Sequence, residues 1–354
     1  MSHLFDPLQL RGVTLRNRIG VSPMCTYSAS DGRAHDWHRV HLGSRAAGGA
    51  GLVITEATAV EPRGRISPAD CGLWDDSFIS AWAPTTRFLS TQGAVPAIQL
   101  AHAGRKAGTR PPFAGRGPLS VDEGSWEPVG PSALPFGDGY RVPRALEETE
   151  LDELAVWFAS AALRAHAAGF QAIEVHAAHG YLLHQFLSPL SNRRDDAWGG
   201  SLENRMRFPL EVVRRVRAAW PDELPLLVRI SATDWMRDGW DVEQAVIFCR
   251  EMRRLGVDLV DCSSGGLVPQ QQVPVGPGYQ VPFAERIRRE AEIPTAAVGM
   301  ITEPVMAAEI VHDGRADIVL LGREFLRDPY WPIRAAGELG YPVPWPPQYA
   351  WAVG

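Results

Sequence analysis

The sequence predicts an α/β protein, a (β/α)8 barrel of the TIM type, on three observations. Eight short runs of β-branched and other apolar residues recur along the 354-residue chain. Helical patterns lie between these runs, so that strand and helix alternate. The runs are apolar throughout, as in parallel strands that helices cover on the outside. Because such barrels commonly form one domain of 200 to about 400 residues, we expect a single domain over residues 1–354.

A β-hairpin is predicted before the first barrel strand. Residues 4–18 alternate apolar and polar side chains around Arg11 and Gly12, which is typical of two short antiparallel strands. We expect this hairpin to cap one end of the barrel. The eight expected barrel strands cover residues 18–24, 51–57, 95–100, 172–175, 226–231, 259–262, 295–298 and 318–321.

Four of the helices between the strands carry start signals, at Thr149, Ser201, Asp241 and Glu303. The first opens with a capping box from Thr149 to Asp152 and closes at Gly169. The last opens with Pro304, a residue that the first turn of a helix accepts. The alternative architecture is an open Rossmann-like sheet. It is disfavoured because no G-x-G-x-x-G follows a first strand.

Two segments fall outside the alternation of strands and helices. Residues 105–145 are rich in Gly and Pro and far exceed an ordinary loop, so we interpret them as a lid over the barrel mouth. Residues 341–354 carry too many prolines for a helix and include four aromatic residues. We expect this tail to pack on another surface, such as that of a neighbouring subunit.

Composition excludes several classes of protein. The net charge of −6 and the scattered arginines disfavour a nucleic-acid surface. No run of about 18 uncharged apolar residues and no signal peptide is visible, so we expect a cytoplasmic protein with no membrane role. The dispersed cysteines indicate reduced thiols instead of disulfides; they are Cys25, Cys71, Cys249 and Cys262.

The richest group of titratable residues follows the fourth expected strand, where barrels place their chemistry. His176, His179 and Tyr181 lie close together there, with Gly180 to allow a bend. Two imidazoles could stabilise a developing negative charge while the phenol donates a proton. The structural alternative is a set of packed core residues. A metal site is disfavoured because no Cys or acidic residue stands at ligand spacing.

Residues at the ends of the last strands predict an anion site. Gly299, Gly322 and Arg323 follow strands seven and eight, the usual phosphate site of a barrel. Arg229 adds an inward charge on strand five, which either an anionic ligand or a salt bridge to Glu56 or Asp261 would neutralise. No lysine stands among the strand-end residues for Schiff-base chemistry. Flavin mononucleotide is the cofactor that fits best, with a flavin-free aldolase or isomerase as the alternative.

Several motifs together resemble the Old Yellow Enzyme family of FMN-dependent ene-reductases, over essentially the whole chain. They are S-P-M-C-x-Y from Ser22, E-A-T-A-V from Glu56, I-Q-L-A-H-A-G-R-K ending at Lys106, E-V-H-A-A-H-G-Y-L-L-H from Glu174, and G-G-S-L-E-N-R from Gly199. The resemblance is strongest to the bacterial thermophilic-like class, which includes the YqjM and xenobiotic reductase types. The long motif around His176 is the specific one.

The resemblance implies a ping-pong reaction in two half-steps. NADPH, or NADH, reduces FMN at N5, and an activated alkene such as an α,β-unsaturated carbonyl compound then takes the hydride. It implies that His176 and His179 bind the carbonyl oxygen and that Tyr181 is the proton donor. Tyr27 and Cys25 match further substrate-side residues.

The same resemblance implies the cofactor contacts. Arg229 would lie near the flavin N1 and O2 edge, and Arg323 would hold the phosphate. Cys25 would tune the flavin and would not act as a nucleophile. The implied contacts are Ser22, Pro23, Met24, Cys25, Ala57, Gln99, Arg229, Gly299, Met300, Gly322 and Arg323.

One feature departs from the family pattern. Members often end in Q-Y-x-R, whose arginine reaches a neighbouring subunit's site, whereas here Gln348 and Tyr349 are followed by Trp351. We expect a homodimer or homotetramer with this tail near a neighbouring site. Two other flavin barrels are disfavoured: a dienoyl-CoA reductase needs a cysteine cluster and a longer chain, and a tRNA dihydrouridine synthase needs a basic surface. A non-catalytic flavin-binding role would leave the histidine pair idle.

Overall fold

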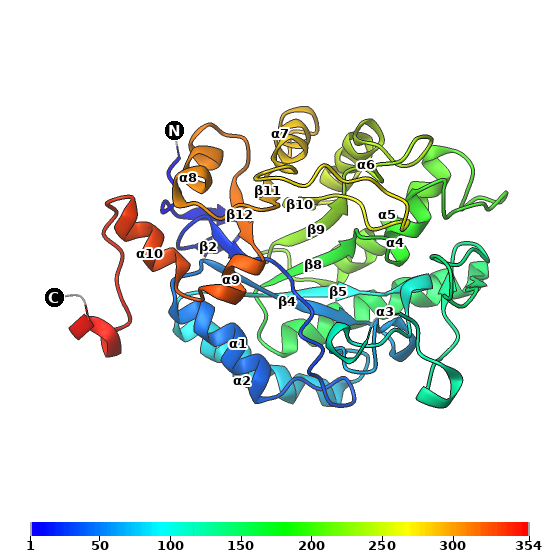
Figure 1. The fold of residues 1–354 in the computed structure, drawn as a ribbon, viewed down its shortest axis with the longest axis horizontal. Helices are drawn as coiled ribbons and strands as arrows, with labels where there is room; N and C mark the ends of the chain where they lie inside the picture. Colours follow the sequence, from blue (N-terminus) through cyan, green and yellow to red (C-terminus); the bar gives the residue numbers. More distant parts are fainter. Residues whose placement is uncertain (1, 116, 353–354) are drawn as a thin grey trace.

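Eight parallel strands close into a barrel, in the order β10-β11-β12-β3-β4-β5-β8-β9. The fold comes from a computed structural model that describes residues 2–115 and 117–352, and Figure 1 shows helices around the outside of the strands. The predicted barrel is confirmed. Its strands are β3 (Ile19–Val21), β4 (Leu52–Ala59), β5 (Val95–Ala101), β8 (Ala172–Ala177), β9 (Leu226–Ser231), β10 (Leu259–Ser263), β11 (Thr295–Val298) and β12 (Ile318–Leu321).

Three strand ends differ from the prediction by two residues or more. β3 stops at Val21 and not at Met24, because Pro23 has no N–H to continue the ladder. β4 continues to Ala59 through a change of register between Ile54 and Ala57. β8 continues to Ala177, because its last two residues still pair with β9. His176 is therefore held in the sheet itself.

The predicted hairpin is confirmed as β1 (Leu8–Leu10) and β2 (Val13–Leu15), which pair antiparallel. Arg11 in the turn takes a positive φ of 49°. Leu10, Val13 and Leu15 pack in one cluster with residues near the starts of the barrel strands, including Leu52 and Leu259. The hairpin therefore closes the N-terminal end of the barrel, away from the strand ends where the chemistry is expected.

The predicted starts at Ser201, Asp241 and Glu303 are confirmed as helix N-caps. The predicted capping box at Thr149 is wrong. The helix begins at Glu148, two residues earlier than a cap at Thr149 would place it, with Glu147 as N-cap and Glu150 completing the box. The helices are α1 (Asp36–Ala47), α2 (Ile79–Thr91), α3 (Glu148–Ala167), α4 (Leu182–Leu187), α5 (Leu202–Ala219), α6 (Val242–Arg254), α7 (Val281–Glu290), α8 (Pro304–His312), α9 (Arg323–Arg327) and α10 (Trp331–Glu338).

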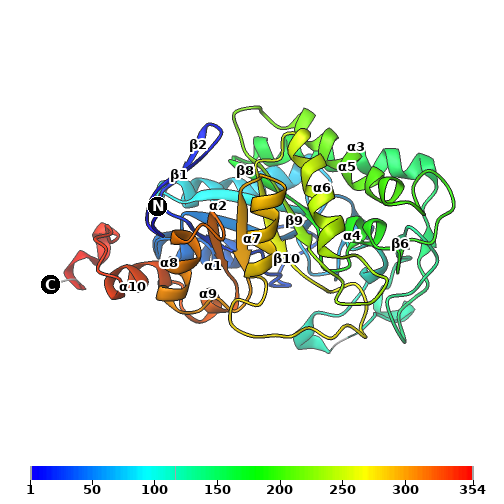
Figure 2. The same ribbon diagram turned by 90° about the horizontal axis from the view of Figure 1, so that it is seen from above.

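The segment 105–145 is irregular apart from short 3-10 turns and two short strands, β6 (Val129–Gly130) and β7 (Arg144–Ala145). The tail is extended and ends in a 3-10 helix over Pro347–Ala352. Figures 1 and 2 show the two segments on opposite sides of the barrel. No helix among the described residues is long and apolar enough to cross a membrane.

Candidate active site

A sharp bend after β8 brings His176, His179 and Tyr181 together. His179 and Gly180 both have positive φ angles, 57° and 71°. The His179 N–H donates to Ser231 Oγ at 2.9 Å, and the Gly180 N–H donates to His184 Nδ1 at 2.9 Å. The His176 ring centroid consequently lies 5.2 Å from that of His179 and 5.0 Å from that of Tyr181.

The two imidazoles are neutral, and each has one nitrogen engaged. Burial, followed by the charge of Arg229, holds the pKa of His176 and of His179 well below the ordinary value. His176 Nδ1 accepts from the Ala178 N–H at 3.3 Å, and His179 Nε2 lies 2.7 Å from Ser263 Oγ. A neutral imidazole carries one proton, so only the second nitrogen of each ring is left to meet a ligand.

Three polar atoms of this cluster have no partner among residues 2–115 and 117–352. They are His176 Nε2, His179 Nδ1 and the Tyr181 hydroxyl, and none is sealed from solvent. Burial raises the pKa of Tyr181 well above its ordinary value, so the phenol keeps its proton. The three atoms can therefore serve a ligand without breaking any internal hydrogen bond.

Lys106 reaches the same cluster, although no lysine was expected there. Its Nζ donates to the carbonyl oxygens of His179 at 2.9 Å and Gly266 at 3.0 Å. It also lies 5.0 Å from the Tyr181 ring centroid. Gly180 makes the close approach of these loops possible, because a Cβ there would lie 2.2 Å from the Gly266 oxygen. The lysine thus joins the loop after β8 to the loop after β10.

Cys25 and Tyr27 pack in the same apolar cluster as Tyr181. All three pack against small residues at the ends of β4 and β5, including Ala57 and Ala101. Burial and the nearby carboxylates of Asp70 and Glu56 raise the pKa of Cys25, so it is a thiol and not a nucleophilic thiolate.

Glu56 accepts a hydrogen bond from the segment that carries Cys25 and Tyr27. The Thr26 N–H donates to one carboxylate oxygen, and His38 Nε2 lies 3.0 Å from the other. Cys71 donates to that second oxygen at 3.2 Å. Burial would raise the pKa of Glu56, but these hydrogen bonds outweigh it and hold the pKa below the ordinary value. Sequence reasoning missed this network, because its members lie far apart in the chain.

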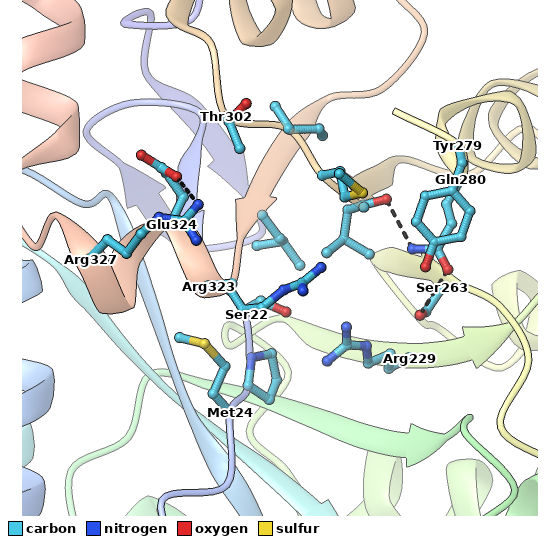
Figure 3. A pocket seen from close by; sticks show the side chains of 17 residues that line it. Ser22, Met24, Arg229, Ser263, Tyr279, Gln280, Thr302, Arg323, Glu324 and Arg327 are labelled. Carbon is cyan, nitrogen blue, oxygen red and sulfur yellow. Dashed lines mark hydrogen bonds and ion pairs between the residues drawn. The ribbon is translucent and has the colours of Figure 1, made fainter. Parts of the chain in front are cut away.

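A pocket of about 370 Å³ opens beside the cluster, at the C-terminal ends of β11, β12 and β3 (Figure 3). Residues that the sequence did not single out complete its wall, among them Tyr279, Gln280, Thr302 and Arg327. The structure brings eight of the predicted cofactor residues together here: Ser22, Pro23, Met24, Arg229, Gly299, Met300, Gly322 and Arg323.

Three predicted cofactor residues do not line this pocket. Cys25 and Ala57 belong to the group around Tyr181. Gln99 is buried, and its side-chain amide donates to Glu174 at 2.7 Å. Burial raises the pKa of Glu174 to about 8, so this carboxyl holds its proton near neutral pH.

Two arginines give the pocket its charge. The Arg229 guanidinium forms an ion pair with Asp261, with Nε 2.9 Å from Oδ2. This is one of the two predicted ways to neutralise its charge, the other being an anionic ligand. The two terminal nitrogens of Arg229, like the guanidinium of Arg323, have no partner among the described residues and are open to solvent. Figure 3 shows both groups directed into the pocket. The remaining donors suit a bound anion.

The lining of the pocket suits a flavin nucleotide by its apolar surface as well as by its charge. Pro23, Met24 and Leu320 supply apolar wall. Gly299 has a φ of 121°, and a Cβ there would lie 2.9 Å from Gln280 Nε2, so a side chain at this point of the wall would be strained and would displace Gln280. The guanidinium N–H groups that remain free are donors of the kind that phosphate requires.

A barrel with such a pocket beside a cluster of neutral donors defines the class of flavin-dependent oxidoreductases. The sequence profile described as the NADH:flavin oxidoreductase / NADH oxidase family matches residues 3–340, so the chain belongs to this family. The resemblance to the Old Yellow Enzyme family is therefore confirmed, with FMN as the cofactor and an oxidoreductase as the class of enzyme.

Relatives agree over nearly the full length of the chain. The chain is 49% identical to a NADPH dehydrogenase of Geobacillus thermodenitrificans, over 98% of this chain and 97% of the relative. It is also 49% identical to a NADPH dehydrogenase of Bacillus licheniformis, over 98% of both chains. Among solved structures, morphinone reductase has a TM-score of 0.80 at 30% identity, covering 96% of this chain and 90% of the other.

Proposed function

We propose that the protein is an NADPH-dependent ene-reductase that reduces the C=C bond of α,β-unsaturated carbonyl compounds. The observation that carries the proposal is a set of three polar atoms, on His176, His179 and Tyr181, that have no partner in the described part of the chain and lie next to a pocket that fits FMN. The NADPH dehydrogenase names of two relatives support NADPH as the reductant, with NADH as the second donor to be tried.

The imidazoles would bind the carbonyl oxygen of the substrate. When bound, FMN supplies the hydride chemistry, accepting a hydride from NADPH and passing one to the alkene β-carbon. Negative charge then develops on the carbonyl oxygen. Donors on His176 and His179 that are fixed beforehand stabilise that charge more than they stabilise the neutral substrate, which is the condition for catalysis.

Tyr181 would complete the reaction by donating its phenolic proton to the α-carbon. Its raised pKa keeps the proton in place until the enolate forms. The positive charge that Lys106 carries beside the ring at neutral pH would stabilise the phenolate that remains. Cys25, as a neutral thiol, and Tyr27 would contact the substrate, while Arg229 and Arg323 would hold the cofactor.

The lid and the assembly also belong to the proposal. The segment 105–145 contacts the mouth through Arg105, which donates to the Leu267 oxygen at 2.8 Å, and through Lys106. The tail points away from the mouth of its own barrel, and Trp351 is 92% exposed. These facts support a lid and a homodimer or homotetramer. Light scattering on the full chain and on a chain ending at residue 340 tests the assembly.

The free cysteines are consistent with a cytoplasmic protein.

Anaerobic half-reactions test the function directly. The purified yellow protein should lose its oxidised-flavin absorbance on adding NADPH, and regain it on adding 2-cyclohexenone with formation of the saturated ketone. A panel of enones, maleimides and nitroalkenes, with NADPH compared with NADH, would define the range. Reduced protein that only oxygen reoxidises would contradict the proposal.

A further inference from the structure

The two imidazoles differ in what fixes their protonation. His176 Nδ1 accepts from a backbone N–H, that of Ala178, and a backbone amide can only donate. The proton of His176 must therefore be on Nε2, where it is free to meet a ligand. His179 Nε2 instead lies 2.7 Å from Ser263 Oγ, a hydroxyl that can donate or accept. Ser263 therefore decides which nitrogen of His179 carries the proton.

Two arrangements of the Ser263 proton are possible. If the hydroxyl donates to Gln280 Oε1, which lies 3.3 Å away, His179 must donate from Nε2 and its Nδ1 is a bare lone pair. That lone pair would repel the oxygen of a carbonyl substrate. If the hydroxyl donates to His179 Nε2, the proton is on Nδ1 and can be donated to the same oxygen.

The surroundings of Gln280 favour the second arrangement. Ser264 Oγ donates to Gln280 Oε1 at 2.6 Å, and Gln280 Nε2 donates to the Val298 oxygen at 3.0 Å. Both ends of this buried amide are therefore satisfied without Ser263. Ser263 Oγ is also closer to His179 Nε2, at 2.7 Å, than to Gln280 Oε1, at 3.3 Å.

We propose that Ser263 is a positioning residue that holds neutral His179 with its proton on Nδ1, so that both imidazoles present an N–H to the same ligand oxygen. Ser263 acts through His179, and its effect on turnover rests on the proposed function. Its place in the wall of the cofactor pocket and at the end of β10 fixes the hydroxyl in the rigid barrel. The direction of the Ser263 hydrogen bond thus sets which nitrogen of His179 is protonated.

Histidine tautomers in the FMN-bound enzyme test the proposal without any turnover. Two-bond 15N–1H correlation spectra of the 15N-histidine-labelled protein distinguish the two ring nitrogens, and the His179→Gln variant assigns the signals. We expect His179 protonated on Nδ1 and His176 on Nε2. Protonation of His179 on Nε2 in the wild-type enzyme would overturn the proposal, even if the enzyme reduced enones.

Ligand binding supplies the second test. The Ser263→Ala variant should bind 4-hydroxybenzaldehyde at least about twofold more weakly, because its His179 can adopt either tautomer and only one of them donates to the ligand. Ser263→Thr, which keeps the hydroxyl, should restore most of the affinity and the Nδ1–H signal. Affinity unchanged in Ser263→Ala, with an unchanged His179 tautomer, would refute the role of Ser263. Failure of the wild-type enzyme to reduce any enone would instead refute the proposed function.

Discussion

Removing the Tyr181 hydroxyl should separate the two halves of the proposed reaction. The Tyr181→Phe variant keeps the ring that packs against His176, so the site should stay folded. Reduction of the flavin by NADPH should be unchanged, whereas reoxidation by an enone should slow by about 10² or more, the usual contribution of a general acid. Stopped-flow absorbance measures each half-reaction separately. Equal rates of enone reduction in both proteins would exclude Tyr181 as the proton donor.

Lys106 predicts a pH dependence of the same half-reaction. Burial, followed by the charge of Arg105, lowers the pKa of Lys106 to about 8. The positive charge is therefore present below this pH and is lost as the pH rises through it. Because that charge stabilises the Tyr181 phenolate, enone reduction should fall as the pH rises from 7 to 9. His176, His179 and Tyr181 keep one protonation state over this range.

Two variants separate the charge of Lys106 from its size. Lys106→Met should be about tenfold slower than the wild type at pH 7 and independent of pH between 7 and 9. Lys106→Arg should keep the rate flat at the higher level, because arginine stays charged. Asp70 and Glu174 are the competing explanations, since burial raises their pKa values to about 7 and about 8. An alkaline decline that persists in Lys106→Met and disappears in Asp70→Asn would assign the effect to Asp70.

Single residues show where sequence reasoning stops. The proximity of His176, His179 and Tyr181 could be predicted, because the three residues lie within six positions of the sequence at one strand end. Lys106 could not, because its hydrogen bonds cross 73 and 160 residues of sequence. Ser263 was visible at a strand end, but its role depends on a contact with a histidine 84 positions away. Contacts that only the closed barrel creates have no local signal.

At the scale of elements, strands were easier to predict than helix starts. The apolar strands are buried on both faces and so leave a continuous pattern. Helix α3 begins earlier than expected, because Glu147 can cap a helix and Thr149 is already inside it. The excursion 105–145 could be recognised by its length, but its fold depends on individual anchors that composition does not reveal.

One such anchor joins the end of the excursion to α3. Arg144 donates to both carboxylate oxygens of Glu150, each at 2.7 Å, and these hydrogen bonds lower the pKa of Glu150 to about 2. The ion pair therefore stabilises the folded protein when the pH is above the ordinary pKa of a glutamate. This stabilisation is lost as the pH falls toward 2. Glu150→Gln should lower the free energy of unfolding by about 1 kcal/mol or less at pH 7, as partly exposed pairs do.

The loss should shrink as the pH falls, because acid removes the same carboxylate from the wild type. Urea denaturation of both proteins between pH 7 and pH 3.5 measures the difference. Glu153→Gln is the matched control, since Glu153 is an exposed residue of the same helix and should show no such difference. A difference for Glu150→Gln that is constant with pH would show that packing, and not charge, supports the anchor.

At the scale of the whole molecule, the barrel could be predicted in full because alternation and count are properties of the entire chain. The pocket could be predicted only in part. Its glycines and Arg323 follow the last strands directly, whereas Tyr279 and Gln280 come from the loop before α7, where no pattern marked them. The wall of the pocket is built from loops that follow different strands, so its residues can be identified only when the arrangement of the strands in the barrel is known.

Arg229 and Arg323 each keep guanidinium nitrogens without a partner among the described residues, and this makes cofactor binding a contribution to the stability of the whole barrel. They lie on β9 and at the start of α9, so one bound FMN molecule would join these two parts of the barrel in the folded state alone. FMN at about 100 times its Kd should add about 2.7 kcal/mol, or about 4 °C in Tm for a chain of this size. Calorimetry of the apoprotein with and without FMN measures the shift.

Riboflavin, which lacks the phosphate, isolates the part of this shift that belongs to Arg323. Arg323→Ala should lose much of the Tm increase given by FMN, while the smaller increase given by riboflavin should stay the same. Arg327 lines the same pocket but already pairs with Glu324, so Arg327→Ala should retain more of the FMN shift. Equal losses with both flavins in Arg323→Ala would mean that Arg323 supports the pocket and does not hold the phosphate.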